Sequence, residues 1–234
     1  MFSKSLRVTP FLLVVICLSL AYFMTDARAQ DPTTAGIVYS QPPNGALLPH
    51  QSSQLGYEQY GSDYDQYVWD NFTLSSTQAI SQIGWRGVYN SGGYWGHGVI
   101  DFIVGIYPSI ASNTQPDPNN PLVEYTLGGN AAETPAWTPG SVLMSQHDYT
   151  FVLPTPFTAT AGTKYWVQIE AIQTGATDWG IVAGSGGVGG HFYAIPGMGG
   201  NFNFHLGSGD AAFTLLGPGQ QAGQHRIYLP FIYK

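Results

Sequence analysis

Aromatic and polar side chains alternate along the sequence in a way that suits sugar binding. Aromatic rings pack flat against sugar rings, and a few polar neighbours orient the hydroxyl groups. Three of the candidates share one face of an expected strand, while the other two sit among glycines that favour exposure. The alternative is that these rings only pack within the protein, as aromatic residues in strands commonly do. The predicted ligand-binding residues are Tyr94, Trp95, Trp166, Gln168 and Glu170.

Carboxylates beside a turn indicate a second kind of chemistry. Asp63, Asp65 and Asp70 offer the hard oxygen ligands that calcium prefers. We expect no cofactor from the sequence other than a calcium ion that these residues could hold. The alternative is an acidic loop that only adds solubility.

No pattern typical of an enzyme stands out, and we expect a non-catalytic protein while keeping one enzymatic alternative open. A glycosidase needs two carboxylates across one cleft, about 5 to 9.5 Å apart. Glu124 and Glu170 lie on expected strands and meet only if those strands are neighbours. Residues 184–189 satisfy G-x-G-x-x-G but precede no helical pattern, so we predict a loop rather than a nucleotide site.

The composition favours strands and excludes several classes of protein. The chain has 234 residues, of which 9% are charged and 14% aromatic, with 30 Gly and 16 Pro. Such an apolar chain is not disordered, and its glycine and proline content argues against a helical bundle. Seven Lys and Arg are too few for the basic surface that nucleic acid requires, so we expect no nucleic-acid partner.

The first 29 residues are typical of an export signal. Lys4 and Arg7 precede an apolar stretch, and Ala27-Arg28-Ala29 fits the A-x-A cleavage pattern. Cleavage would remove three bases, one acid and the only cysteine, leaving four bases, thirteen acids and a net charge of −9. We therefore expect a secreted or cell-surface protein without disulfides and without a transmembrane span in the mature chain.

Short period-two segments follow one another along the rest of the chain, with turns rich in Gly, Pro and Asn between them. We expect an all-β fold, a two-sheet antiparallel sandwich of jelly-roll type preceded by a signal-peptide helix. The expected organisation is a signal peptide (1–29), an N-terminal extension (30–56), the sandwich (57–217) and a linker with an apolar tail (218–234). The expected strands are 67–74, 80–89, 99–107, 122–127, 147–153, 164–172, 179–183, 191–195 and 211–216.

Three blocks resemble a bacterial secreted β-sandwich domain found in PEP-CTERM and other choice-of-anchor exported proteins. Residues 67–76 read YVWDNFTLSS, and residues 149–157 read YTFVLPTPF before an AGTKYWV segment at 161–167. The glycine-rich tract and closing AAFTLLG segment at 178–217 complete the resemblance. It implies an exported sandwich without established catalytic residues. The chain carries no Pro-Glu-Pro sorting tail, so the resemblance does not extend to membrane sorting.

These observations together favour a secreted, non-catalytic surface or matrix module that binds a glycan or a cell-surface protein. A glycoside-cleaving jelly-roll enzyme and a purely structural surface protein are the alternatives. The positions of Glu124 and Glu170, and the presence or absence of a hollowed aromatic face, separate the three.

Overall fold

The apolar alternation produces strands throughout the part of the chain that the computed structural model describes. That part is residues 36–48, 52–55, 65–89, 98–136, 146–174, 179–196 and 202–218, which all belong to the unit Thr34–Lys234. These residues contain no helix. The strands are β1 (Ile37–Gln41), β2 (Pro43–Leu47), β3 (Ser53–Leu55), β4 (Tyr67–Thr73), β5 (Gln78–Tyr89), β6 (Val99–Pro108), β7 (Val123–Thr126), β8 (Thr134–Ala136), β9 (Gln146–Ala159), β10 (Lys164–Gln173), β11 (Trp179–Gly184), β12 (Gly190–Pro196), β13 (Phe202–Ser208), β14 (Asp210–Ala211) and β15 (Phe213–Leu216).

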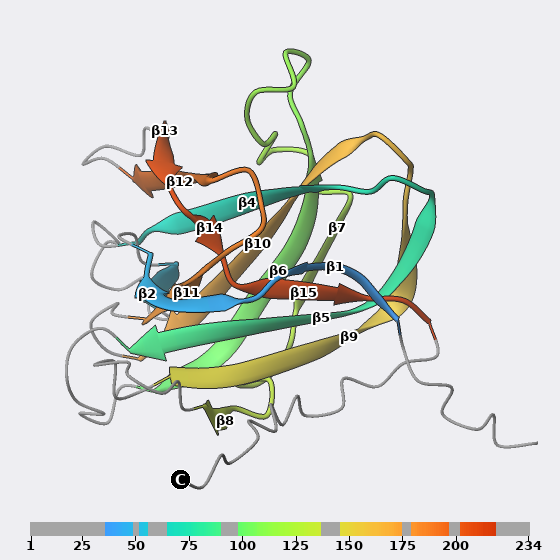
Figure 1. Ribbon diagram of the computed structural model, residues 1–234. Coiled ribbons are helices and arrows are strands. Elements are labelled where there is room, and N and C mark those ends of the chain that lie inside the picture. Colours follow the sequence, from blue (N-terminus) through green and yellow to red (C-terminus); the bar gives the residue numbers. More distant parts are fainter. Residues whose placement is uncertain are drawn as a thin grey trace, which may run out of the picture. The chain divides into compact units, whose positions relative to one another are not determined.

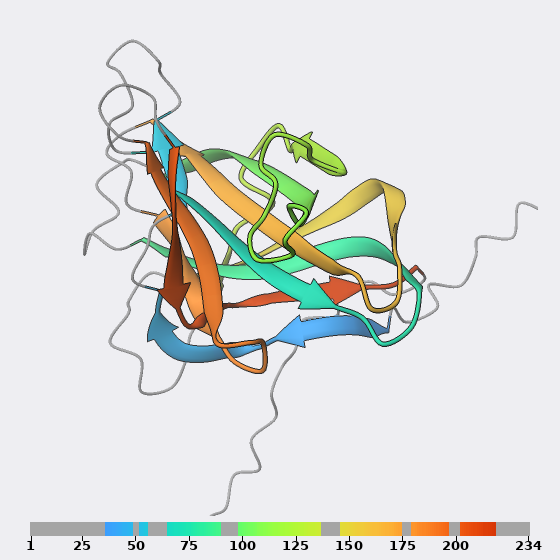
Figure 2. The same ribbon diagram turned by 90° about the horizontal axis from the view of Figure 1, so that it is seen from above.

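Two sheets pack against each other as a β-sandwich, which confirms the predicted fold class. The first, called the β5 sheet below, contains β1, β2, β5, β8, β9, β11, β14 and β15; the second, the β10 sheet, runs β13-β12-β4-β10-β6-β7, with β3 beside β10. All pairs between these strands are antiparallel except β3 with β10. Figures 1 and 2 show β5 and β15 in one layer and β4, β10 and β6 in the other. The chain crosses repeatedly between the layers, as in jelly rolls.

Aromatic rings fill much of the space between the sheets. Trp85 stacks on Tyr149 with ring centroids 5.5 Å apart, and Phe102 meets both rings and Trp179 edge-on at 5.0–5.2 Å. Edge-to-face and offset contacts of this kind add to the stabilisation from area burial. Because the sequence has a single cysteine, no disulfide can form within the chain, and we attribute the stability of the fold to this core.

β10 lies in the middle of its sheet and is buried on both faces. Tyr165, Val167 and Ile169 face the β5 sheet and join the main core. Trp166 and the residues that alternate with it point to the opposite side, called the outer face below. The predicted division of this strand into two faces is therefore confirmed, and the outer face carries a second, smaller cluster of rings.

The structure differs from the expected organisation at two places. Residues 37–55, expected as an extension, supply β1, β2 and β3, and β1 pairs with β15 while β3 pairs with β10. The glycine-rich tract, in which only 191–195 was expected as a strand, contains the whole hairpin β12-β13, which pairs from Gly190↔Ser208 to Pro196↔Phe202. In both segments strand pairing outweighs a polar or glycine-rich composition. The expected signal peptide (1–29) and, apart from Pro218, the expected linker and tail (218–234) lie outside the described residues.

Candidate functional site

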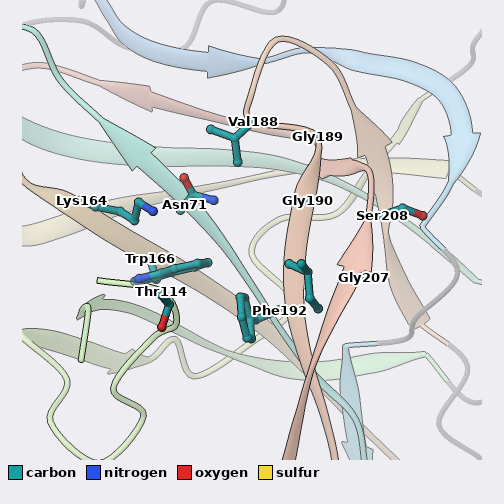
Figure 3. Close-up of a pocket in the computed structure, with 11 residues that line it drawn as sticks. Asn71, Thr114, Lys164, Trp166, Val188, Gly189, Gly190, Phe192, Gly207 and Ser208 are labelled. Atoms are coloured by element: carbon teal, nitrogen blue, oxygen red, sulfur yellow. The ribbon is translucent and has the colours of Figure 1, made fainter. Parts of the chain in front are cut away.

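A pocket of about 450 Å³ opens on the outer face of the β10 sheet, where the β12-β13 hairpin separates from β4. β12 pairs with β4 from Ala194↔Tyr67 to Phe192↔Trp69, and beyond Phe192 the hairpin continues paired only with itself. Figure 3 shows the hairpin on one side of the pocket and side chains of β4 and β10 on the other. The lining residues are Asn71, Thr114, Lys164, Trp166, Val188, Gly189, Gly190, Phe192, Leu206, Gly207 and Ser208.

Trp166 forms the floor of this pocket. Its indole N–H donates to the Ser109 hydroxyl at 2.9 Å, and the Phe192 ring meets it edge-on with centroids 5.4 Å apart. Trp166 is only 2% exposed. The ring is therefore a fixed floor, held by its packing within the protein, and not an open stacking platform.

Lys164 and two exposed aliphatic residues shape the rim. The Lys164 ammonium lies 5.7 Å from the centre of the Trp166 ring and donates to the Asn113 carbonyl at 3.2 Å. Val188 is 72% and Leu206 71% exposed, although both are apolar. Apolar side chains exposed beside a concave polar site are typical of a binding surface.

Gln168 and Glu170 lie further along β10 on the same outer face, but they do not line the pocket. Both are buried, and the Gln168 amide donates to Glu170 over a long 3.4 Å. Burial raises the pKa of Glu170 well above its ordinary value, and the nearby charges of Asp65 and Glu124 raise it further. Glu170 Oε1 has no hydrogen-bond partner among the described residues.

The same face carries a group of rings that we call the outer aromatic cluster. It consists of Trp69, Tyr107, Trp166 and Ala194, with Tyr67, Phe192 and Phe204 packed against them. Tyr67 stacks on Trp69 at 6.0 Å, and Phe204 from β13 packs on Trp69 at 5.7 Å. The hairpin therefore covers aromatic side chains that a bare sheet would leave in water.

The two carboxylates of the glycosidase alternative lie on one face but do not face the pocket. Glu124 pairs with Gly105, and Gly105 pairs with Gln168, so Glu124 and Glu170 have Cα atoms about 12 Å apart on ideal sheet spacings. Glu124 accepts a hydrogen bond from Tyr107. Glu170 is 2% exposed, whereas a catalytic acid must reach a glycosidic oxygen.

The structure keeps Asp65 and Asp70, two of the three expected calcium ligands, apart. Asp65 and Asp70 are about 16 Å apart along an extended chain, and both are buried. Asp70 points into the core, where it accepts hydrogen bonds from the Gln41 side chain at 2.9 Å and the Ala211 amide at 2.6 Å. Within the described ranges no three acidic, histidine or cysteine side chains are grouped to hold a metal. Asp63 lies outside those ranges.

The amides of the glycine-rich loop before β12 already donate hydrogen bonds to a carboxylate of the chain itself. Asp210 accepts hydrogen bonds from the Gly187 amide at 3.0 Å and the Gly189 amide at 2.7 Å. These are the amides that a phosphate would use in a glycine-rich nucleotide site. The observed contacts agree with the expected loop and also fix Val188 at the rim of the pocket.

Sequence reasoning identified Trp166 but missed its partners at the pocket. Lys164 lies two residues before Trp166, so the period-two pattern places both on one face of the strand. This pattern could have predicted Lys164 as a residue of the site. Phe192 and Leu206 come from a hairpin whose position beside β4 depends on strand pairing, which the sequence does not display. Tyr94 and Trp95 lie outside the described residues.

Comparison with known families identifies the domain but not its activity. Residues 37–183 match the model of a domain of unknown function (DUF7901), and no curated protein is significantly similar to the chain. The match begins at the first residue of β1, which agrees with the observed start of the sandwich. None of the described residues forms a helix that could cross a membrane. Since the match covers more than half of the sequence, the chain belongs to the DUF7901 family.

Proposed function

We propose that this protein is an exported, non-catalytic surface or matrix module that binds a glycan in the pocket between β10 and the β12-β13 hairpin. The observation that carries the proposal is the pocket itself. It combines an aromatic floor, an exposed aliphatic rim and several polar side chains within a volume typical of small-molecule sites.

Sugars fit this combination because they present apolar C–H faces and hydroxyl edges together. Val188 and Leu206 offer apolar surface to the former, while Asn71, Thr114 and Ser208 offer donors and acceptors to the latter. Export is proposed on the N-terminal pattern, in which a basic start, an apolar stretch and an A-x-A sequence follow one another. An exported protein would meet extracellular or surface glycans.

The test is a glycan array followed by calorimetry, comparing the purified mature protein with rim variants. Replacing Val188 and Leu206 together by Gln removes exposed apolar surface without touching the core, so the fold should be retained. We expect affinity for any array hit to fall about tenfold. Val152→Gln is the matched control, because Val152 is 64% exposed on β9 of the other sheet.

Three outcomes would contradict the proposal. Binding to no glycan on the array would favour a purely structural surface protein. Binding that the rim variant leaves unchanged would move the site away from this pocket. Release of reducing sugar ends from a bound glycan would favour the glycosidase alternative.

A further inference from the structure

The charges around the pocket differ from those of the chain as a whole. Cleavage of the expected signal would leave a net charge of −9. Yet none of the residues that line the pocket is acidic, and Lys164 is the only one that carries a charge. The site is thus a small region of positive charge on an acidic protein.

Of the cationic side chains in the described part of the chain, Lys164 is the one that is not already paired with a carboxylate. The described ranges contain two Lys and Arg residues, Lys164 and Arg86. Arg86 is engaged by both oxygens of Asp148, at 2.7 and 2.8 Å. Lys164 forms no salt bridge in this part of the chain; it uses one of its three donors on the Asn113 carbonyl.

The carboxylate of Asp210 already has hydrogen-bond partners in the glycine-rich loop beside the pocket. Asp210 is held by two loop amides, from Gly187 and Gly189, and is not among the lining residues. A ligand carboxylate or sulfate beside Lys164 would therefore meet an ammonium group, the Asn71 amide and the Thr114 hydroxyl. Figure 3 shows the Lys164 and Asn71 side chains at the same end of the pocket.

We propose that the pocket selects an acidic sugar, a residue bearing a carboxylate or sulfate group that pairs with Lys164 while its ring packs against the aliphatic rim. This inference rests on the proposed glycan-binding function and adds the chemical class of the ligand. A charge-assisted hydrogen bond in a partly enclosed site gives selectivity over a neutral sugar of the same shape.

The experiment uses pairs of probes that differ only in charge. Oligosaccharides of galacturonate, glucuronate and mannuronate are each compared with their methyl esters, and a sulfated galactan oligosaccharide is compared with the unsulfated one. Binding to the mature protein is measured by calorimetry at 50 and 500 mM NaCl. We expect at least one charged member to bind five- to tenfold more tightly than its neutral partner, and the difference to shrink at high salt.

Variants of Lys164 and Arg86 test whether the preference for charged probes depends on the cation in the pocket. Lys164→Met should abolish the preference for the charged probe, Lys164→Arg should retain it, and Arg86→Met, the matched control, should leave it unchanged. Thermal melting of each variant verifies that it remains folded.

The inference is overturned if charged and neutral partners bind equally, or if folded Lys164→Met keeps the preference. In either case sensitivity to the rim variant would leave the proposed glycan-binding function standing. Binding of no probe, charged or neutral, together with no hit on the array would reject the inference and the proposed function together. The separate carboxylate and sulfate arms identify the source of the negative charge.

Discussion

Gly87 is a single position at which packing leaves no room for a side chain. A Cβ atom placed there would overlap the indole ring of Trp179, a residue that is fully buried and donates to the Tyr149 hydroxyl at 3.1 Å. The ring cannot move away without breaking this hydrogen bond and its contact with Phe102. The glycine is therefore required by its neighbour and not by a turn.

We predict that Gly87→Ala destabilises the fold by about 1–3 kcal/mol, the usual range for overpacking a core. Gly84→Ala in the same strand is the matched control, since a Cβ there meets nothing closer than 3.7 Å. That control should be neutral or slightly stabilising. Urea unfolding of both variants measures the difference, and equal stabilities would contradict the packing argument.

Trp166 shows how far the site could be predicted at the scale of residues. Its type and strand face were correct, because period-two alternation alone assigns a face. Its exposure was left open by the sequence, and the structure buries the ring because Phe192 and Lys164 cover it from neighbouring positions. The order of the strands in the sheet decides which side chains cover its outer face. A single sequence does not reveal that order.

At the scale of elements, the loop between β11 and β12 depends on one carboxylate. Asp210 is buried at the start of β14 and binds the amides of Gly187 and Gly189. Removing the carboxylate would leave both amides without a hydrogen-bond acceptor in the protein. The loop would then lose the contacts that define its shape. Val188, which lies between the two glycines, would then no longer be fixed at the rim.

We predict that Asp210→Ala speeds hydrogen exchange at the Gly187 and Gly189 amides at least tenfold and weakens glycan binding by a similar factor. Asp148→Ala is the control, because Asp148 is an exposed carboxylate on β9 of the β5 sheet. Hydrogen-exchange mass spectrometry resolves this loop from the strands. Unchanged protection in a folded Asp210→Ala variant would show that something other than Asp210 holds the loop.

The strands show which elements could be predicted and which could not. The nine expected strands correspond to β4, β5, β6, β7, β9, β10, β11, β12 and β15, because each alternates apolar residues strongly enough to be recognised. β2, β3 and β13 lack that signal, since they are short, polar or glycine-rich. They become strands through pairing, with β11 for β2, with β10 for β3 and with β12 for β13.

Considered as a whole, the molecule joins its two sheets through buried polar groups near one end of the sandwich. Asp70 on β4 of the β10 sheet accepts from Gln41 on β1 and from the Ala211 amide on β14, both in the β5 sheet. His191 on β12 is bonded through Nδ1 to the Gly209 carbonyl at 2.8 Å. Burial lowers the pKa of His191, so that histidine is neutral in the folded protein near pH 7.

These groups make the stability of the fold depend on pH. Above neutral pH only the buried carboxyl groups contribute to this dependence, because the histidine is then neutral in both states. Burial raises the pKa of Asp70 from 3.8 to about 8, although the Ala211 and Asn71 amides oppose the shift. A raised pKa means that the folded state binds the proton more tightly than the unfolded state. The resulting stabilisation is complete below pH 3.8 and is lost as the pH rises through about 8. His191 acts in the opposite direction, because a lowered pKa removes stability as the pH falls below 6.5.

Between pH 7.5 and 8.5 we therefore expect the free energy of unfolding to fall by about 1 kcal/mol, because in this range the histidine is almost entirely neutral in both states while Asp70 loses its proton on unfolding. Asp70→Asn keeps an oxygen for the Ala211 amide and removes the proton, so its slope should be clearly shallower than that of the wild type. Glu170→Gln should also make the slope shallower, because burial raises the pKa of Glu170 in the same direction, and Asp148→Asn, which alters an exposed carboxylate, should leave the slope unchanged. Denaturation with urea at five pH values measures each slope. An Asp70→Asn variant that keeps the wild-type slope would mean that Asp70 is already ionised in the folded protein, stabilised by the donors around it against the penalty of burial.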